Sequence, residues 1–261
     1  MPPRDELDEV RTEVAIGNRV LAELGLATGL RASLGHASMR LPSDPTKFMV
    51  KGRGYRMDIL SRMRPEEMVT CDLEGNWVDG PPGSLQCGEV KIHSCIYKAR
   101  PDIKSVVHVH PKFTVLMSVL GKPWRPLAQE GVGLFQKQPA VYPRTKVVTS
   151  EEEGQQVAKL LGDGRFLLLL GHGAVTTGNS IEQSVTMMGQ LEHQAEYNYM
   201  AYAAAGRDHP YIPDDLVKEL LDAQARGGYP EPHFAKRVAE VGPPRFTGIW
   251  RYYEELVSGD L

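Results

Sequence analysis

Apolar residues recur at helical spacing in several parts of the chain. Over residues 7–24 they fall at steps of three, four and seven positions, which predicts an opening helix with one buried face. Ser180 is a favourable N-cap residue, and the apolar pattern after it predicts a long helix over 180–205. The same spacing predicts helices over 89–99 and 214–225.

Shorter apolar runs favour strands. They lie at 48–50, 68–72, 76–78, 105–109 and 165–170. The turn residues Glu74 and Gly75 predict that the second and third runs form a hairpin. The segment Gly35–Arg40, which contains glycine and serine, is interpreted as a turn. Because strand and helix patterns alternate through the middle of the chain, the predicted class is α/β with a mixed sheet.

Composition narrows the possibilities without changing this outline. The chain has 261 residues, of which 41% are hydrophobic and 24% charged, so it can build a sizeable core. A net charge of -3 argues against non-specific binding to nucleic acid or to an anionic membrane. Three cysteines without a Cys-x-x-Cys pair favour free thiols in a reducing compartment. The polar N-terminus and the shortness of the apolar runs lead us to expect a cytoplasmic protein without a membrane partner.

Histidines provide the candidate chemistry. In His108-Val109-His110 both imidazoles would project from the same face of a strand end, which is half of a metal site. His172 follows another predicted strand and stands between two glycines, so it would be exposed to a pocket and could complete a three-histidine site. The alternative is that these are ordinary surface or turn histidines.

Glu89 begins a predicted helix, and His93 lies four residues later on the same face. A carboxylate at a helix N-terminus is favoured by the helix dipole, which is a sufficient structural explanation. Near metal ligands, the same pair would instead provide a general acid or base and its partner.

Together these residues resemble the class II aldolase/adducin head family. The resemblance covers roughly residues 5–205, and it depends on four segments that agree in order, spacing and flanking residues. These segments are Gly35-His36-Ala37-Ser38-Met39-Arg40, Glu89 with Ile92-His93, Pro101-Asp102-Ile103 continuing into Val106-Val107-His108-Val109-His110-Pro111, and Leu169-Leu170-Gly171-His172-Gly173. The resemblance implies a three-layer α/β/α fold with a central, mostly antiparallel sheet, and a homo-oligomer, commonly a tetramer. We expect residues 1–205 to form this metal-binding domain and residues 206–261 to be an extension packed on it or on a neighbouring subunit.

Site roles also follow from the resemblance. It implies that His108, His110 and His172 bind one divalent metal ion per subunit and that Glu89 is the catalytic acid or base. Three imidazoles fit zinc, manganese, iron or cobalt comparably, so the sequence does not rank these metals.

The departures from the aldolase pattern concern the substrate. Sugar-phosphate aldolases of this family hold the phosphate with amide and hydroxyl side chains, and those positions here carry His36, Lys51-Gly52 and Cys87-Gly88. Basic residues such as His36, Lys51 and Arg53 suit a carboxylate better, although Lys51 and Arg53 would equally serve as polar loop residues. The predicted substrate-binding residues are His36, Ser38, Lys51, Arg53 and His93, with the alternative that Ser38 only orients its segment.

The pattern is similar to the branch that decarboxylates aromatic or pyridine dicarboxylates, including its aromatic C-terminal end. The resemblance therefore implies a metal-dependent decarboxylase of a dihydroxyphthalate-like ring acid, in which the metal stabilises the negative charge left by carbon dioxide. The alternatives are a retro-aldolase acting on a non-phosphorylated hydroxy-keto acid and a non-heme iron oxygenase. A non-enzymatic adducin-like scaffold is disfavoured because the three histidines and Glu89 are all present.

Overall fold

The computed structural model describes residues 6–134, 137–225, 232–241 and 248–259. Its α-helices are α1 (Glu6–Glu23), α2 (Val90–Ala99), α3 (Lys112–Leu120), α4 (Glu151–Leu161), α5 (Ile181–Ala205), α6 (Asp214–Ala225), α7 (Pro232–Val241) and α8 (Gly248–Val257). Its strands are β1 (Gly35–Arg40), β2 (Lys47–Lys51), β3 (Met68–Asp72), β4 (Trp77–Asp79), β5 (Ser105–Val109), β6 (Val141–Tyr142), β7 (Phe166–Leu169) and β8 (Gly173–Gly178). Short 3₁₀ helices cover Gly29–Arg31, Leu60–Arg62, Pro65–Glu67 and Gln129–Leu134.

The strands form one eight-stranded sheet in the order β4-β3-β2-β1-β5-β8-β7-β6. Every neighbouring pair is antiparallel except β6 and β7, so the predicted mostly antiparallel sheet is confirmed. In the β1–β5 pairing, His36 lies opposite His108. The centre of the sheet therefore brings residues from two distant parts of the sequence next to each other.

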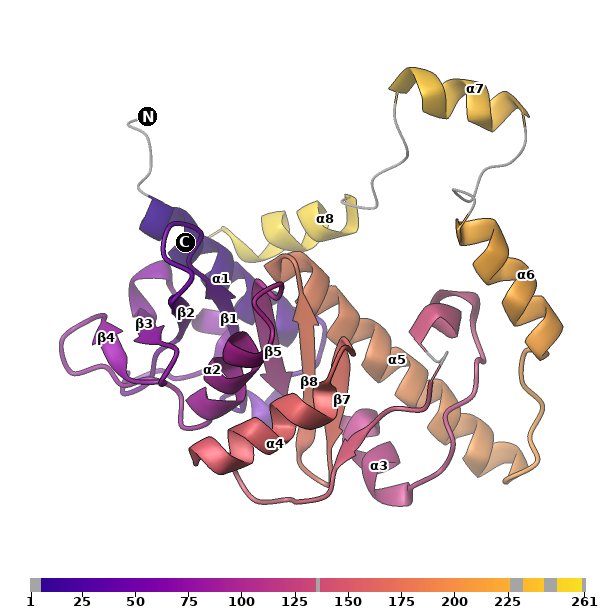
Figure 1. The fold of residues 1–261 in the computed structure, drawn as a ribbon, viewed down its shortest axis with the longest axis horizontal. Coiled ribbons are helices and arrows are strands. Elements are labelled where there is room, and N and C mark those ends of the chain that lie inside the picture. The colour runs from indigo at the N-terminus through magenta and orange to yellow at the C-terminus, as the bar shows by residue number, and fades with distance from the viewer. Residues whose placement is uncertain (1–5, 135–136, 226–231, 242–247, 260–261) are drawn as a thin grey trace.

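Helices cover both faces of this sheet (Figure 1). On one face, α2 and α4 pack on side chains such as Phe48 and Val106. On the other face, α1, α3 and α5 pack on alternating residues of the same strands, including Ala37 and Val107. Because each central strand is buried on both faces, its period-two pattern supplies two cores, and the three-layer prediction is confirmed.

Two sequence interpretations need correction. Gly35–Arg40 is strand β1 and not a turn. It lies between β2 and β5, and its polar residues His36, Ser38 and Arg40 alternate with Ala37 and Met39 as in a strand, a pattern that its glycine and serine content obscured. Helix α4 was not predicted, although Ser150 and Glu153 form a capping box at its start.

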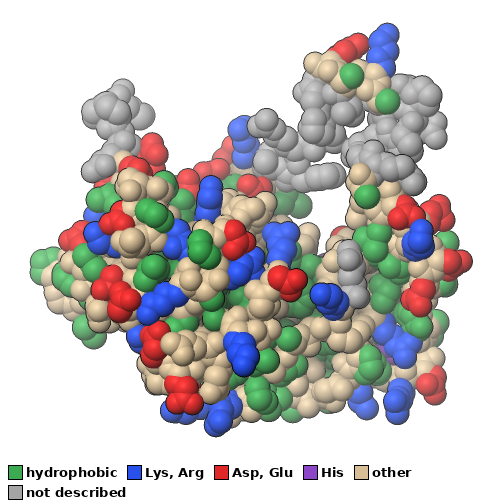
Figure 2. Space-filling view, viewed as in Figure 1, with side chains coloured by type: hydrophobic (Ala, Val, Ile, Leu, Met, Phe, Trp, Pro, Cys, Tyr) green, Lys and Arg blue, Asp and Glu red, His purple; other side chains and the backbone are tan. Residues whose placement is uncertain are grey.

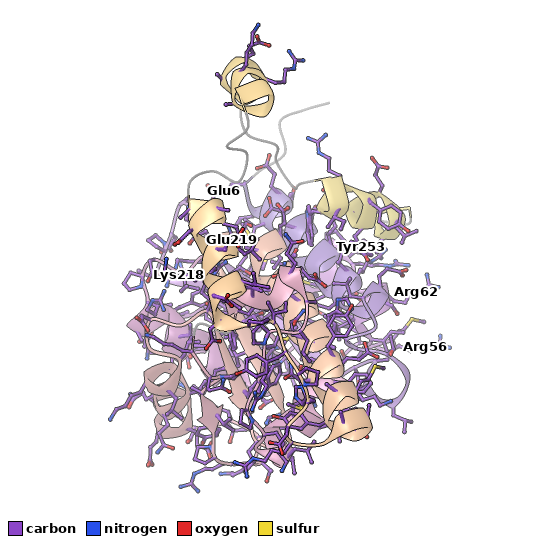
Figure 3. The ribbon with its side chains drawn as sticks, turned by 90° about the vertical axis from the view of Figure 1, so that its right-hand side faces the viewer. Glu6, Arg56, Arg62, Lys218, Glu219 and Tyr253 are labelled. Carbon is purple, nitrogen blue, oxygen red and sulfur yellow. The ribbon has the colours of Figure 1, made fainter. Side chains whose placement is uncertain are left out.

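The C-terminal helices differ in how they meet the layered body. Trp250 and Tyr253 of α8 pack on the core cluster that contains α1, and the Arg19 guanidinium donates to the Val257 carbonyl at 2.8 Å. Figure 3 shows Tyr253 on this helix beside the body. In Figure 1, α7 stands apart from the layers. The division of the chain at residues 205 and 206 stays a prediction.

Within the described part of the chain, no helix has the length and apolarity needed to cross a membrane. On the face shown in Figure 2, Lys and Arg side chains are interspersed with Asp and Glu, and hardly any histidine surface is visible. This distribution agrees with the near-neutral charge of the sequence.

Candidate metal centre

Three loops or element ends bring four side chains to one place. His108 is on β5 and His110 follows the strand directly, while His172 lies in the tight turn between β7 and β8. Glu89 is the N-cap residue of α2, but its side chain makes no capping hydrogen bond. The carboxylate is therefore directed away from its own helix and toward the histidines.

The four side chains, which we call the carboxylate–histidine cluster, converge through defined atoms. His108 Nε2 lies 3.1 Å from His110 Nε2 and 3.2 Å from Glu89 Oε2. His172 Nε2 lies 3.5 Å from Glu89 Oε1. The candidate ligand atoms all lie within 4.8 Å of one another, so the three predicted metal ligands and the predicted acid or base share one site.

The hydrogen-bonding pattern tests whether a metal ion fits. His108 Nδ1 lies 3.0 Å from the Ala174 carbonyl oxygen, which can only accept, so the proton is on Nδ1 and the Nε2 lone pair is directed at His110. A backbone carbonyl behind a ring nitrogen is the usual support of a metal-binding histidine. The buried His172 Nδ1 has no hydrogen-bond partner. Lone pairs that face each other in a buried site fit a divalent cation.

Protonation preferences support the same conclusion. Burial, followed by the neighbouring His108 and His172, lowers the pKa of His110 to about 3, so this imidazole is neutral near pH 7 and its lone pair is available. Burial alone would raise the pKa of Glu89, but the neighbouring imidazoles of His108 and His172, followed by His36, outweigh burial and hold that pKa well below its usual range. Val148 N–H also donates to Glu89 Oε1 at 3.0 Å.

His36, His93 and Ser38 lie behind this cluster. The His36 ring is 5.4 Å from the His108 ring and 4.7 Å from the His93 ring, measured between centroids. His93 and Ser38 are fully buried, and they contact each other and Tyr97. The structure thus brings the three predicted residues together, but only His36 lies directly beside the cluster. Their predicted role in substrate binding is not tested by this placement.

The basic residues predicted to bind a carboxylate occupy different environments. Lys51 is fully buried and its Nζ pairs with the carboxylate of Asp58. Arg53 donates to the Ser33 carbonyl at 3.2 Å. Arg56, a further basic residue of the same segment, projects outward at the edge of the molecule in Figure 3. Asp58 was not predicted as an internal partner of Lys51. Because the two side chains are paired, Lys51 would have to lose this partner before it could bind a substrate.

His209 and His233 lie in proline-containing segments of the sequence, which favours a position at the surface. His209, expected at the surface, is buried against the Tyr202 ring, and its Nδ1 lies 2.9 Å from the Pro210 carbonyl. The side chain of His233 lies outside the described residues. Tyr97 was not predicted as part of the site, although its position four residues after His93 on a helix was a usable signal.

Comparisons with known proteins agree with the resemblance found in the sequence. A family model for the class II aldolase and adducin N-terminal domain matches residues 12–223. A 3,4-dihydroxyphthalate decarboxylase of Arthrobacter keyseri is 30% identical over 221 residues, which are 81% of this chain and 86% of that protein.

Solved structures show the same fold. An aldolase II superfamily protein from Pseudomonas syringae matches with a TM-score of 0.77 and 21% identity, covering 98% of this chain and 94% of that one. An L-fuculose 1-phosphate aldolase from Glaciozyma antarctica PI12 matches with a TM-score of 0.70 and 22% identity, covering 85% and 86%. At these identities the likeness concerns the fold alone.

Proposed function

Because the chain belongs to the class II aldolase and adducin family, we propose that it is a carbon–carbon lyase, and specifically a divalent-metal-dependent decarboxylase of a hydroxylated aromatic or pyridine dicarboxylate. One observation supports this most: Glu89 and three imidazoles converge in a chain that covers most of a 3,4-dihydroxyphthalate decarboxylase. The substrate class comes from that relative, and the chemistry comes from the cluster.

His108, His110 and His172 would hold the ion through Nε2 atoms. When bound, a divalent ion supplies a Lewis acid that stabilises negative charge on oxygen. The carbonyl of Ala174 behind His108 keeps that imidazole in the tautomer a ligand requires.

Glu89 is the carboxylate of the cluster and is placed to move a proton. In the proposed reaction it takes the proton of the ring hydroxyl and returns it to the ring carbon that loses the carboxylate. The carbon–carboxylate bond breaks, a carbon–hydrogen bond forms, and carbon dioxide leaves without charge. The Val148 N–H at 3.0 Å holds one carboxylate oxygen in place, so the other oxygen, Oε2, is the one we assign to proton transfer.

The test is a product assay on protein reconstituted separately with zinc, manganese, cobalt and iron(II). Each preparation is incubated with 3,4-dihydroxyphthalate and with 3-hydroxy-2-methylpyridine-4,5-dicarboxylate, and carbon dioxide, aldehyde and oxygen are followed together. We expect one carbon dioxide for each ring acid consumed, with at least one of the metals and one of the acids.

The matched control is His110→Ala, which removes one proposed ligand and should lose both the metal and the activity. Aldehyde release without carbon dioxide would overturn the proposal in favour of a retro-aldolase. Oxygen consumption coupled to turnover would overturn it in favour of an oxygenase.

A further inference from the structure

Behind the carboxylate–histidine cluster, four side chains form a continuous series of short hydrogen bonds. His36 Nδ1 lies 2.6 Å from His93 Nε2, His93 Nδ1 lies 2.6 Å from Ser38 Oγ, and Ser38 Oγ lies 2.8 Å from the Tyr97 hydroxyl. We call this series the His36–Tyr97 chain. All four residues are at most 2% exposed, so water does not supply alternative partners.

Each link of the His36–Tyr97 chain holds one proton, and this couples the links. If the Tyr97 hydroxyl donates to Ser38, Ser38 donates to His93 Nδ1 and His93 donates from Nε2 to His36 Nδ1. His36 then carries its own proton on Nε2. In the opposite arrangement, His36 donates from Nδ1 and its Nε2 is an acceptor, while Ser38 can donate to the Val106 carbonyl at 3.3 Å.

The open end of the series is next to the proposed active site. His36 is the cross-strand partner of His108, and their ring centroids are 5.4 Å apart. Because His93 occupies Nδ1, Nε2 is the His36 nitrogen that a ligand beside the cluster would meet. A carboxylate can only accept hydrogen bonds, so it selects the arrangement in which Nε2 carries the proton.

We propose that Tyr97, Ser38 and His93 are positioning residues that orient the His36 ring and place its proton on Nε2, where it donates to the ring carboxylate that the substrate keeps. This inference rests on the proposed function for the identity of the substrate. It gives the site a neutral donor for an anion without adding a buried charge, which a lysine in the same place would do.

A second metal ion is the competing explanation, because His36, Cys87 and His93 offer three ligand atoms within 4.8 Å of one another. Two imidazole nitrogens bound to one tetrahedral zinc at 2.0–2.1 Å would be about 3.3 Å apart. The His36 and His93 nitrogens are 2.6 Å apart, which is the separation of a hydrogen bond. The geometry therefore favours the hydrogen-bonded series.

The test compares Tyr97→Phe with Tyr142→Phe, a change at another buried tyrosine in the same core cluster. Ring ¹⁵N signals of histidine in the metal-loaded protein report which nitrogen carries the proton. We expect Tyr97→Phe to move the ring signals of both His93 and His36, and Tyr142→Phe to move neither. Phthalate, which lacks the ring hydroxyl, is then titrated as an unreactive probe, and its Kd should rise about three- to tenfold in Tyr97→Phe only.

Kinetics with the ring acid that the protein decarboxylates should show a change in binding and not in turnover. The KM should be about three- to tenfold higher in Tyr97→Phe than in the unchanged protein, and the kcat should stay within about twofold. Unchanged His36 signals, or equal phthalate affinity in the two variants, would overturn the inference. Binding of a second metal equivalent that Cys87→Ser abolishes would also overturn it. The ring signals and the phthalate titration need no turnover, so they decide this inference even if the protein releases no carbon dioxide.

Discussion

The protein contains two groups of histidines, the carboxylate–histidine cluster and the His36–Tyr97 chain, which meet at the contact between the His36 and His108 rings. They differ in how the ring nitrogens of their histidines are paired. In the carboxylate–histidine cluster, the Ala174 carbonyl fixes the proton of His108 on the far nitrogen, so lone pairs face each other. In the His36–Tyr97 chain, every interior acceptor meets a donor. Histidines occur in both groups, so the partner of the far ring nitrogen is what distinguishes the histidines of a cation site from those of a hydrogen-bonded support.

Helix α2 contributes to both groups. Its N-cap residue Glu89 belongs to the cluster, while His93 and Tyr97, on the following turns, belong to the chain behind it. One helix positions both groups, but their side chains have different partners, so damage to one group should be separable from damage to the other by metal content and by stability. The following predictions use that separation.

The largest effect is expected for Glu89→Gln. The amide retains an oxygen for the Val148 N–H but does not transfer the proton, so kcat should fall about 100- to 10,000-fold while metal content stays at one per chain. Glu153→Gln, in the capping box of α4, is the matched control and should leave kcat unchanged. Measurement of full kcat in Glu89→Gln would remove this residue from the mechanism.

Gly173→Ala should weaken metal binding without removing any ligand. A Cβ at this position would lie 2.4 Å from the Val109 carbonyl oxygen, 3.0 Å from His110 Cδ2 and 3.1 Å from His108 Cε1, so both rings must move. Metal affinity, measured by competition with a chelator, should fall about 10- to 100-fold.

Gly189→Ala is the control for that change, since its Cβ would meet only Leu24 Cδ1 at 3.5 Å. It should bind metal as the unchanged protein does and gain slightly in helix stability. If both variants bind metal equally well, the cluster is not as closely packed around its ligands as this geometry indicates.

Arg40→Lys should affect folding and not metal binding. The Arg40 guanidinium donates to the carbonyls of Tyr97 and Pro45 at 2.6 Å and of Ile103 at 3.1 Å, and it stacks on the Tyr97 ring. Lysine cannot reproduce this planar set of donors, so the free energy of unfolding should fall by about 2–3 kcal/mol. Urea titration measures the loss, and Arg64→Lys, at a 61% exposed side chain, should change it by less than about 0.5 kcal/mol.

An Arg40→Lys protein that lost its metal while keeping its stability would contradict the separation of the two groups. In that case the support behind His36 would act directly on the cluster. The same preparation therefore serves both measurements.

The members of the carboxylate–histidine cluster could be predicted from the sequence because the patterns that mark them are local. His108 and His110 lie at the end of strand β5, as their spacing predicts. His172 lies between two glycines in the turn before β8. The α/β class followed in the same way from periodicity, and the layered architecture followed from the family resemblance.

Long-range pairing was not readable from the sequence. Strand β1 was interpreted as a turn because it contains glycine and serine, although its polar and apolar residues alternate as in a strand. Lys51 looked like a free cation because its partner Asp58 follows it in a segment without regular pattern. Helical spacing gives the face of the helix on which His93 lies but not its place in the layer behind His36, and its role in substrate binding stays a prediction.

The smallest effect is expected at the outer surface of α2, where Glu151 of α4 pairs with Lys91 at 2.8 Å and Lys98 at 3.0 Å. Hydrogen bonds from Lys91 and then Lys98 lower the pKa of Glu151 to about 2, against about 4.3 in an unfolded chain. The carboxylate is thus more acidic when folded, so its contribution to stability is complete above about pH 4.3 and is lost as the pH falls toward 2. Since the Glu151 side chain is 37% exposed, that contribution should be below about 1 kcal/mol after screening.

Glu151→Gln should therefore lower the free energy of unfolding slightly at pH 7 and leave metal content and kcat unchanged. The difference in stability from the unchanged protein should shrink in acid and in high salt. A loss of metal in this variant would mean that the position of α2, and with it Glu89, depends on its surface ion pairs more than on the core beneath it.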